Sequence, residues 1–339
     1  MQFPFPVPED HFMQYSVRLF AAAAVSLVSA GAASALTLGT DFAPHYTATD
    51  LGSIAGVPAN YGGLTLKAGS PDTLLIGGAA NGSAGRLYEV GLVRDPVDGS
   101  ITGFTGTPTA MGGVGEFNDG GVVYGPGGVL FTARWNINEL GQTLPGGADE
   151  YRIDSLAAFG VPTSISALNF VPTGFGGAGQ GKIVTYSGGA WFDMMLTPDG
   201  GGGFDLAFTV IDLDPVAPGI QNLPGGPEGF TYVAAGNPGF AVNSMLVAEY
   251  SAGKIAAYEV DANGNPILST RRDFITGLSG AEGAYIDPVS GDFLFSTFGG
   301  GNRVIRVDGF NAPAVPLPAG AWLLLSGLGA VAALRRRRG

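Results

Sequence analysis

Short strands that alternate hydrophobic and polar residues, separated by glycine-rich turns, recur along this chain and limit the folds open to it. In each unit a glycine-led strand is followed by a more hydrophobic strand and then by a strand that ends in an acidic residue. The clearest unit has its strands at 283–287, 292–297 and 303–308, joined by turns that contain Pro-Val-Ser-Gly and Gly-Gly-Gly-Asn. Period-two alternation bounded by proline and glycine predicts β-strands. The body of the chain is therefore predicted to be all-β.

Five copies of this unit can be found. Their first strands begin near Gly63, Gly121, Ala167, Glu228 and Gly283. Four-stranded units that repeat at roughly 50 to 60 residues are typical of a β-propeller, in which each small twisted sheet is a blade whose faces are buried only by its neighbours. The number of copies predicts five blades. Glycine, at 58 of 339 residues, favours the tight turns that such short strands require.

The last unit stops after three strands, so a strand from elsewhere must complete it. The unassigned segment Leu36–Phe42 alternates and is predicted to supply this outer strand, which would join the two ends of the domain. Two alternatives stay open. Six blades would result if Thr47–Val57 formed a sheet of its own, and a β-sandwich would predict unequal strand spacing.

Two short motifs in the last unit, Gly291-Asp292-Phe293 and Asn302-Arg303-Val304, resemble the propeller repeats of the NHL and SMP-30/gluconolactonase type. The resemblance implies a propeller fold. Proteins of the SMP-30/gluconolactonase family hold a divalent ion, typically calcium, on Glu, Asn and Asp of inner strands, and use a further carboxylate in lactone hydrolysis. Carried over by position, the implied metal ligands are Asn169, Glu228 and Glu282, and the implied catalytic base is Glu116 or Asp119.

The same acidic residues have a plainer interpretation, because a carboxylate at a strand entry often accepts backbone N–H groups and ends a turn. We therefore carry two hypotheses. The first is a noncatalytic surface protein that binds matrix polysaccharide, a protein partner or calcium, with aromatic side chains such as Trp135, Trp191, Tyr186 and Tyr250 available to stack on sugars. The second is a calcium-dependent hydrolase of lactones or small esters.

The composition excludes several other classes of function. The net charge is −12 and the pI is near 4.4, whereas nucleic-acid binding requires clustered Lys and Arg. There is no cysteine, and hence no disulfide, thiol nucleophile or Cys-ligated metal. The two histidines, His11 and His45, are too few for a histidine zinc site, and a Ser-His-Asp triad would have to use His45.

The N-terminal segment 1–35 has the features of a signal peptide. Arg18 precedes an apolar run from Leu19 to Val28, and Ala33-Ser34-Ala35 offers the small residues that signal peptidase requires, so cleavage is predicted after Ala35. Residues 1–12 are rich in proline and make a poor start of such a peptide, so Met13 is the predicted true start. The domain at 36–313 is therefore predicted to be exported.

The C-terminal segment 315–339 combines three features in order. A proline motif is followed by an apolar run from Trp322 to Leu334 and a basic cluster; the motif is Val315, Pro316, Leu317, Pro318 and Ala319, and the cluster is Arg335, Arg336, Arg337 and Arg338. Prolines keep the motif extended, and an apolar run of 13 residues is short for a membrane span. The arginines are expected to stay at the cytoplasmic face.

This tail resembles the PEP-CTERM sorting signals, and most closely their VPLPA variant, which a membrane transpeptidase called exosortase is thought to cut near the proline motif. The glutamate that defines the main class is Leu317 here, which supports the variant. The resemblance implies signal peptidase and exosortase as processing partners and a temporary stay in the inner membrane. The mature protein would then be periplasmic, attached to the outer surface or released, where exopolysaccharide or surface proteins are its expected partners.

Overall fold

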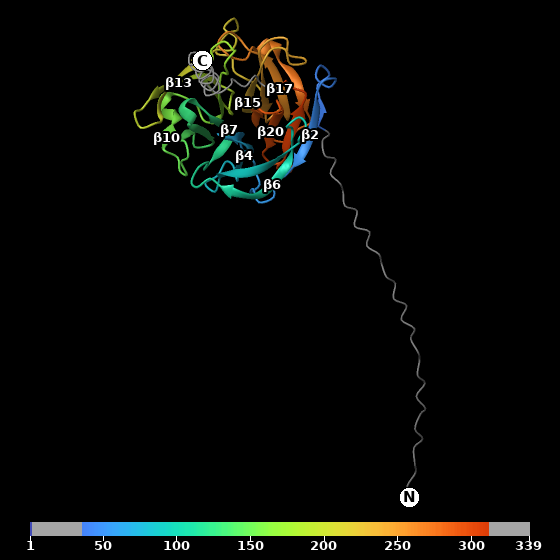
Figure 1. The fold of residues 1–339 in the computed structure, drawn as a ribbon. Helices are drawn as coiled ribbons and strands as arrows, with labels where there is room; N and C mark the ends of the chain where they lie inside the picture. The colour runs from blue at the N-terminus through green and yellow to red at the C-terminus, as the bar shows by residue number, and fades with distance from the viewer. Residues whose placement is uncertain (2–35, 312–339) are drawn as a thin grey trace, which may run out of the picture. The chain divides into compact units, whose positions relative to one another are not determined.

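The computed structural model describes residues 36–311 and folds them into five antiparallel sheets arranged around a common axis (Figure 1). In each sheet the first strand of the repeat is innermost and the following strands run outward in chain order. This is a five-bladed β-propeller, as the repeats predict. The predicted leader at 1–35 and tail at 315–339 lie outside the described residues.

The blades are numbered in the order of their inner strands. Blade 1 contains β3 (Leu64–Lys67), β4 (Ser70–Gly78), β5 (Arg86–Arg94) and β6 (Ile101–Ala110). Blade 2 contains β7 (Asn118–Tyr124), β8 (Leu130–Arg134), β9 (Glu139–Thr143) and β10 (Arg152–Ser155). Blade 3 contains β11 (Ile165–Phe170), β12 (Gly181–Thr185), β13 (Trp191–Pro198) and β14 (Phe204–Ile211).

The last two blades each take up a strand from the start of the domain. Blade 4 contains β15 (Pro227–Val233), β16 (Ser244–Glu249), β17 (Lys254–Glu259), β18 (Arg272–Thr276) and, at its outer edge, β1 (Thr37–Leu38). Blade 5 contains β19 (Ala281–Ile286), β20 (Phe293–Thr297), β21 (Val304–Asp308) and β2 (Thr47–Gly52). Three short 3₁₀ helices complete the described part: η1 (Pro126–Gly128), η2 (Leu156–Phe159) and η3 (Leu268–Thr270).

An N-terminal strand closes the last blade, as predicted, but the prediction that Leu36–Phe42 supplies this strand was wrong. The closing strand is β2, whose Thr47 pairs with Asp308, and in Figure 1 it lies in blue beside the orange strands of blade 5. The segment Leu36–Phe42 instead contributes β1, where Thr37 pairs with Thr276 in blade 4. Both segments alternate and both are short. The choice therefore depends on which blade edge each one reaches, and the sequence does not contain that information.

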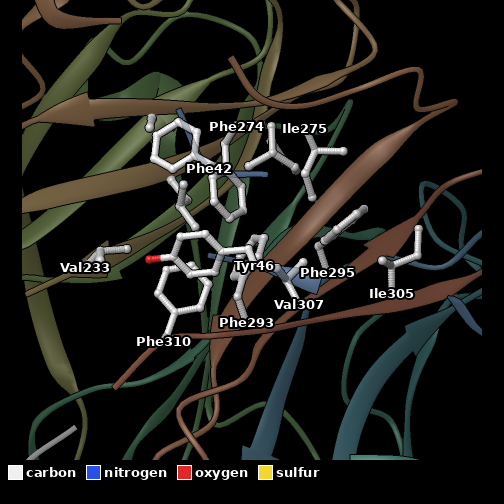
Figure 2. Packing of buried hydrophobic residues seen from close by; sticks show 14 of the residues in the cluster. Phe42, Tyr46, Val233, Phe274, Ile275, Phe293, Phe295, Ile305, Val307 and Phe310 are labelled. Carbon is white, nitrogen blue, oxygen red and sulfur yellow. The ribbon is translucent and has the colours of Figure 1, made fainter. Parts of the chain in front are cut away.

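Hydrophobic clusters fill the spaces between neighbouring blades. One cluster joins blades 4 and 5, and Figure 2 shows how Phe42, Tyr46, Phe274, Phe293 and Phe310 pack within it. Similar clusters lie between blades 2 and 3, 5 and 1, 3 and 4, and 1 and 2. Each sheet therefore buries its two faces against its neighbours, so the blades stabilise one another around the ring.

Polar contacts join the first and last blades. Arg94 Nη1 lies 2.5 Å from Asp287 Oδ2, which is fully buried, and Arg306 Nη1 donates to the carbonyl of Ile101 at 2.7 Å. The end of the described chain is held as well, because the Asn311 amide donates to Asn237 Oδ1 at 2.7 Å. Residues 36–311 thus contain all five blades and the contacts that close the ring, so this part should fold on its own. Within it, no helix is long and apolar enough to span a bilayer.

Candidate binding site at the channel mouth

One position recurs at the start of every inner strand, directly before a glycine or alanine that packs close to the axis. We call it the entry position. Its five occupants, in blade order, are Gly62, Asp119, Ser166, Glu228 and Glu282. Three of the five are acidic, and a propeller brings equivalent positions of its blades together around the channel. The fold therefore converts three acids that are far apart in the sequence into neighbours.

The small residue after each entry position lets the inner strands approach closely. A Cβ atom on Gly120 would lie 2.1 Å from the carbonyl oxygen of Glu228, and one on Gly229 would lie 2.2 Å from that of Glu282. Distances this short leave no room for any side chain, so these two positions require glycine. The channel is therefore constricted just beyond the entry positions. The carboxylates lie on one side of this constriction, at the end of the channel where the inner strands begin.

Asp119, Glu228 and Glu282 form a compact group, called here the carboxylate cluster. Each contributes an oxygen to a set whose members all lie within 4.8 Å of one another. The three residues are 0%, 4% and 1% exposed. One oxygen of each carboxylate, Asp119 Oδ2, Glu228 Oε2 and Glu282 Oε1, is buried without a hydrogen-bond partner in the described part of the chain. Buried polar atoms without partners are rare in folded proteins and mark strained or functional places.

Burial and mutual repulsion raise the pKa values of the three carboxyl groups in the cluster. Burial raises the pKa of Asp119 to about 7, although contacts with Glu282, Glu228 and the Asn81 amide act in the opposite direction. The pKa of Glu228 is raised well above its usual range, first by burial and then by the charges of Asp119 and Glu282. Burial and the charge of Asp119 do the same to Glu282. Three carboxylates at this spacing resist simultaneous ionisation unless a cation joins them.

No Lys or Arg of the described residues neutralises the cluster, because none of their ion pairs includes a member of it. Arg134, which lies opposite Asn118 in the sheet of blade 2, pairs instead with Glu150 at 2.6 Å and with Glu139 at 3.1 Å. The cluster therefore carries uncompensated negative charge whenever its members ionise.

A second recurring position lies directly after the second strand of each blade. Four blades place an aromatic residue there: Trp135, Tyr186, Tyr250 and Phe298, called here the mouth aromatics. In blade 1 the same position holds Ala79. All four aromatic residues are half-buried, unlike the core aromatics, so they lie at the surface end of the channel.

Backbone hydrogen bonds show that the mouth aromatics occupy equivalent places. In each case the aromatic residue's N–H donates to the carbonyl of the residue two positions before the entry position: Trp135 to Phe117 at 2.9 Å, Tyr186 to Ser164 at 3.0 Å, Tyr250 to Gly226 at 2.9 Å and Phe298 to Gly280 at 2.8 Å. The mouth aromatics are thus fixed next to the carboxylate cluster by the same contact in four blades.

The mouth aromatics also contact one another around the axis. The ring centroids of Trp135 and Tyr186 are 6.2 Å apart, those of Tyr186 and Tyr250 are 6.0 Å apart, and those of Tyr250 and Phe298 are 6.3 Å apart. All three pairs meet edge to face, the arrangement that aromatic quadrupoles favour. Burial raises the pKa of Tyr250, and the charge of Glu282 raises it further. The phenol and the carboxylate are therefore electrostatic neighbours.

Two residues predicted to belong to the site lie elsewhere. Asn169 is at the other end of β11, beyond the constriction, where Nδ2 donates to the Phe230 carbonyl at 2.8 Å beside a cavity of about 90 Å³. Glu116 precedes β7 but faces two arginines, with Arg86 Nη2 at 3.2 Å and Arg134 Nη2 at 3.9 Å. The structure thus brings together Asp119, Glu228 and Glu282, and leaves the other two predicted residues outside.

The aromatic residues named from the sequence divide in the same way. Trp135, Tyr186 and Tyr250 are at the mouth, whereas Trp191 is fully buried between blades 3 and 4 and donates to Asn265 Oδ1 at 3.0 Å. The sequence prediction missed Phe298. Aligning the ends of the second strands, Ala-Arg-Trp, Val-Thr-Tyr, Ala-Glu-Tyr and Ser-Thr-Phe, would have found it.

The geometry of the carboxylate cluster is compatible with calcium. Calcium–oxygen bonds of about 2.4 Å place oxygens on opposite sides of the ion roughly 4.8 Å apart, and the ion prefers carboxylate oxygens. The oxygens of Asp119, Glu228 and Glu282 all fit within that limit. Three residues supply only part of the six to eight ligands that calcium takes, so water or another molecule would have to complete the shell.

Comparisons with known proteins identify no family for this chain. No protein-family model and no curated protein matches the sequence. Among solved structures, an auxiliary nutrient binding protein from Bacteroides thetaiotaomicron is 12% identical, with a TM-score of 0.45 over 81% of this chain and 68% of that one.

Two further solved structures are similar to this chain to a comparable degree. The PQQ-bound aldose sugar dehydrogenase from Streptomyces coelicolor is 12% identical, with a TM-score of 0.38 over 76% and 83% of the two chains. A putative 6-phosphogluconolactonase from Bacteroides uniformis is 13% identical, with a TM-score of 0.38 over 69% and 63%. At such identities nothing about function follows from these likenesses.

Proposed function

We propose that this protein is an exported, noncatalytic binding propeller whose ligand site is the mouth of its central channel, and that the site takes a cation. The observation that carries the proposal is the carboxylate cluster. Its three acids are 0 to 4% exposed, each contributes an oxygen within 4.8 Å of the other two, and none has a basic partner in the described chain. A fold that only needed turn caps would pair these oxygens with backbone N–H groups, whereas one oxygen of each acid has no partner among the described residues.

Calcium is the inorganic ion that we propose for this site. Its preference for carboxylate oxygens and its bond lengths match the cluster, and its charge would relieve the repulsion among the three acids. Binding would then let Glu228 and Glu282 ionise at neutral pH. Calcium would thus act through charge balance on residues that the fold already holds in place.

The geometry favours binding over hydrolysis. A calcium-dependent lactonase needs a general base in addition to its metal ligands. Of the two residues predicted for that role, Asp119 belongs to the proposed ligand set and Glu116 faces Arg86 and Arg134. His45 is exposed in the turn before β2, away from the inner strands. None of these three residues is therefore both close to the cluster and free to act as base.

The proposal is tested by titrating calcium into purified residues 36–313 in a calorimeter. We expect one calcium per chain, and at least tenfold weaker binding in Glu282→Gln, because an amide keeps the shape of the side chain but removes its charge. The matched control is Glu116→Gln, which changes a nearby acid outside the cluster and should leave calcium affinity within about twofold. Absence of calcium binding, or equal binding by wild type and Glu282→Gln, would show the proposal to be wrong.

Export and processing form the second part of the proposal. The leader at 1–35 and the tail at 315–339 support delivery across the inner membrane, cleavage by exosortase near Val315 to Ala319, and residence in the periplasm or at the outer surface. There exopolysaccharide or surface proteins would be the partners. Mass spectrometry of secreted protein should find it without Arg335 to Arg338, and a mature protein that keeps this cluster would contradict the sorting step.

A further inference from the structure

We propose that the organic ligand of the channel mouth is a primary amine, whose ammonium group binds the carboxylate cluster while its carbon body lies against the mouth aromatics. The inference rests on the proposed function in one respect, that the cluster is a cation site. It goes further in naming an organic cation and in giving the aromatic residues a role.

The number of donors and acceptors matches. A primary ammonium carries three N–H donors, and the cluster has three carboxylates, each with one buried oxygen that lacks a partner in the described chain: Asp119 Oδ2, Glu228 Oε2 and Glu282 Oε1. A nitrogen with tetrahedral N–H···O bonds of about 2.8 Å holds its acceptors roughly 4.6 Å apart. The cluster oxygens lie within 4.8 Å of one another, so one ammonium could reach all three residues.

The mouth aromatics distinguish an amine from a bare metal ion. A metal ion needs further oxygen ligands. The four mouth aromatics offer few of them, because Trp135, Tyr186 and Tyr250 each carry a single polar side-chain atom and Phe298 carries none. Aromatic faces attract organic cations and also cover alkyl groups, as in the aromatic cages that bind methylated amines. A cation with a carbon body therefore uses both halves of the site.

Other buried charges do not offer this combination. Lys182, which is fully buried, contacts Asp193 and Asn265, and Arg271 Nη2 lies 2.5 Å from Glu249 Oε2. Those groups are satisfied within the fold. At the mouth, by contrast, Trp135 Nε1 is also buried without a hydrogen-bond partner among the described residues, so the site has an unused donor beside its unused acceptors. An amine that also carries a hydroxyl or carbonyl group would use both.

The test is a titration of residues 36–313 with four probes: n-butylammonium, methylammonium, tetramethylammonium and 1-butanol, at about pH 8, where primary amines are still protonated. We expect n-butylammonium to bind at least tenfold more tightly than each of the others. Methylammonium lacks the carbon body, tetramethylammonium lacks N–H donors, and butanol lacks the charge. Fluorescence reports binding, since Trp135 is at the mouth and Trp191 is buried in the core.

Two kinds of variant separate this inference from the calcium proposal. Tyr250→Leu and Phe298→Leu should each weaken n-butylammonium binding at least threefold and leave calcium affinity within twofold, whereas Glu282→Gln should weaken both ligands. Phe159→Leu, an exposed aromatic on η2, is the matched control and should change neither. Calcium and n-butylammonium should also compete.

The outcomes are distinguishable. Calcium binding without amine binding, or equal affinity for n-butylammonium and tetramethylammonium, overturns the inference and leaves the proposed function intact. Amine binding that survives both aromatic variants also overturns it. Failure of calcium and of all four probes to bind overturns the proposed function together with the inference.

Discussion

Buried charges occur in two settings in this propeller, and the two differ in whether they are paired. Between blades and within sheets they are paired: Arg94 binds Asp287 at 2.5 Å where the ring closes, and Arg271 binds Glu249 at 2.5 Å inside blade 4. At the channel mouth the carboxylate cluster has no cationic partner in the described chain. The first kind of charge joins parts of the fold, and the second does not.

The comparison shows that the carboxylate cluster lowers the folding stability of the protein. A buried charge without a partner is destabilising by several kcal/mol, and the group responds by shifting its pKa. The raised pKa values of the cluster are that response. Groups with strongly perturbed acidity at the mouth of a channel are typical of functional sites, because a ligand can supply the missing charge. The following predictions test this contrast.

The largest expected effect is a loss of stability with rising pH in the cation-free protein. The pKa of Asp119 moves from 3.8 in the unfolded chain to about 7 in the fold, so the folded state binds more protons between these values. Its contribution is fully present below about pH 4 and is lost as the pH rises through 7, on the order of 4 kcal/mol in total. Urea unfolding of residues 36–313 between about pH 4 and 8 measures it.

An acid that is paired with a basic residue should show the opposite dependence of stability on pH in the same experiment. Hydrogen bonding from Lys254 lowers the pKa of Asp273, so the stability it contributes is present at neutral pH and is lost in acid. Saturating calcium should remove the loss that develops as the pH rises to about 7, and leave the acid side unchanged. A cation-free protein whose stability is flat or rises from pH 5 to 8 would contradict the description of the cluster as unpaired.

The next largest effect should come from breaking a paired charge. Arg94→Met leaves Asp287, which is fully buried, without its cation and should destabilise the protein by about 3 kcal/mol. The matched control is Arg303→Met, because Arg303 and Asp50 form a pair that is 39% and 44% exposed and should contribute less than about 1 kcal/mol. Thermal unfolding compares the two. Equal losses would mean that burial does not govern the value of these pairs.

The sequence contained the repeat and therefore most of the fold. All five inner strands were located from the alternating pattern, led by glycine in every unit but the one that begins near Ala167, because period-two patterns and turn residues are local signals. The closing strand was misassigned, since Leu36–Phe42 and Thr47–Gly52 differ little in pattern and only the three-dimensional path of the chain selects β2. The number of blades follows from local sequence patterns, whereas the blade edge that each N-terminal strand joins does not.

The candidate site was only partly predictable for a related reason. Asp119, Glu228 and Glu282 each precede a glycine, a signal visible in the sequence, whereas Asn169 is three residues beyond the equivalent Ser166 and so reaches the other end of the channel. In a strand that rises about 3.3 Å per residue, three positions amount to roughly 10 Å. Register within the repeat, more than residue type, decides which polar groups meet.

The smallest of the three effects has the opposite sign to that of Arg94→Met and therefore tests the contrast most directly. Glu282→Gln should stabilise the cation-free protein at pH 7, because the amide keeps the shape of the side chain and no longer has to be neutralised on folding. The pKa of Glu282 is raised well above its usual range by burial and by the charge of Asp119, so the gain is the free energy of neutralising this carboxyl on folding, which the variant avoids. It should disappear near pH 4, where the carboxyl is largely protonated in both states. The control is Glu249→Gln, which removes the buried carboxylate that Arg271 binds, leaves Arg271 only its pair with Asp273, and should destabilise. If both variants lost stability alike at pH 7, the cluster would be as well paired as the charges between strands, and the case for a ligand at the channel mouth would lose its physical basis.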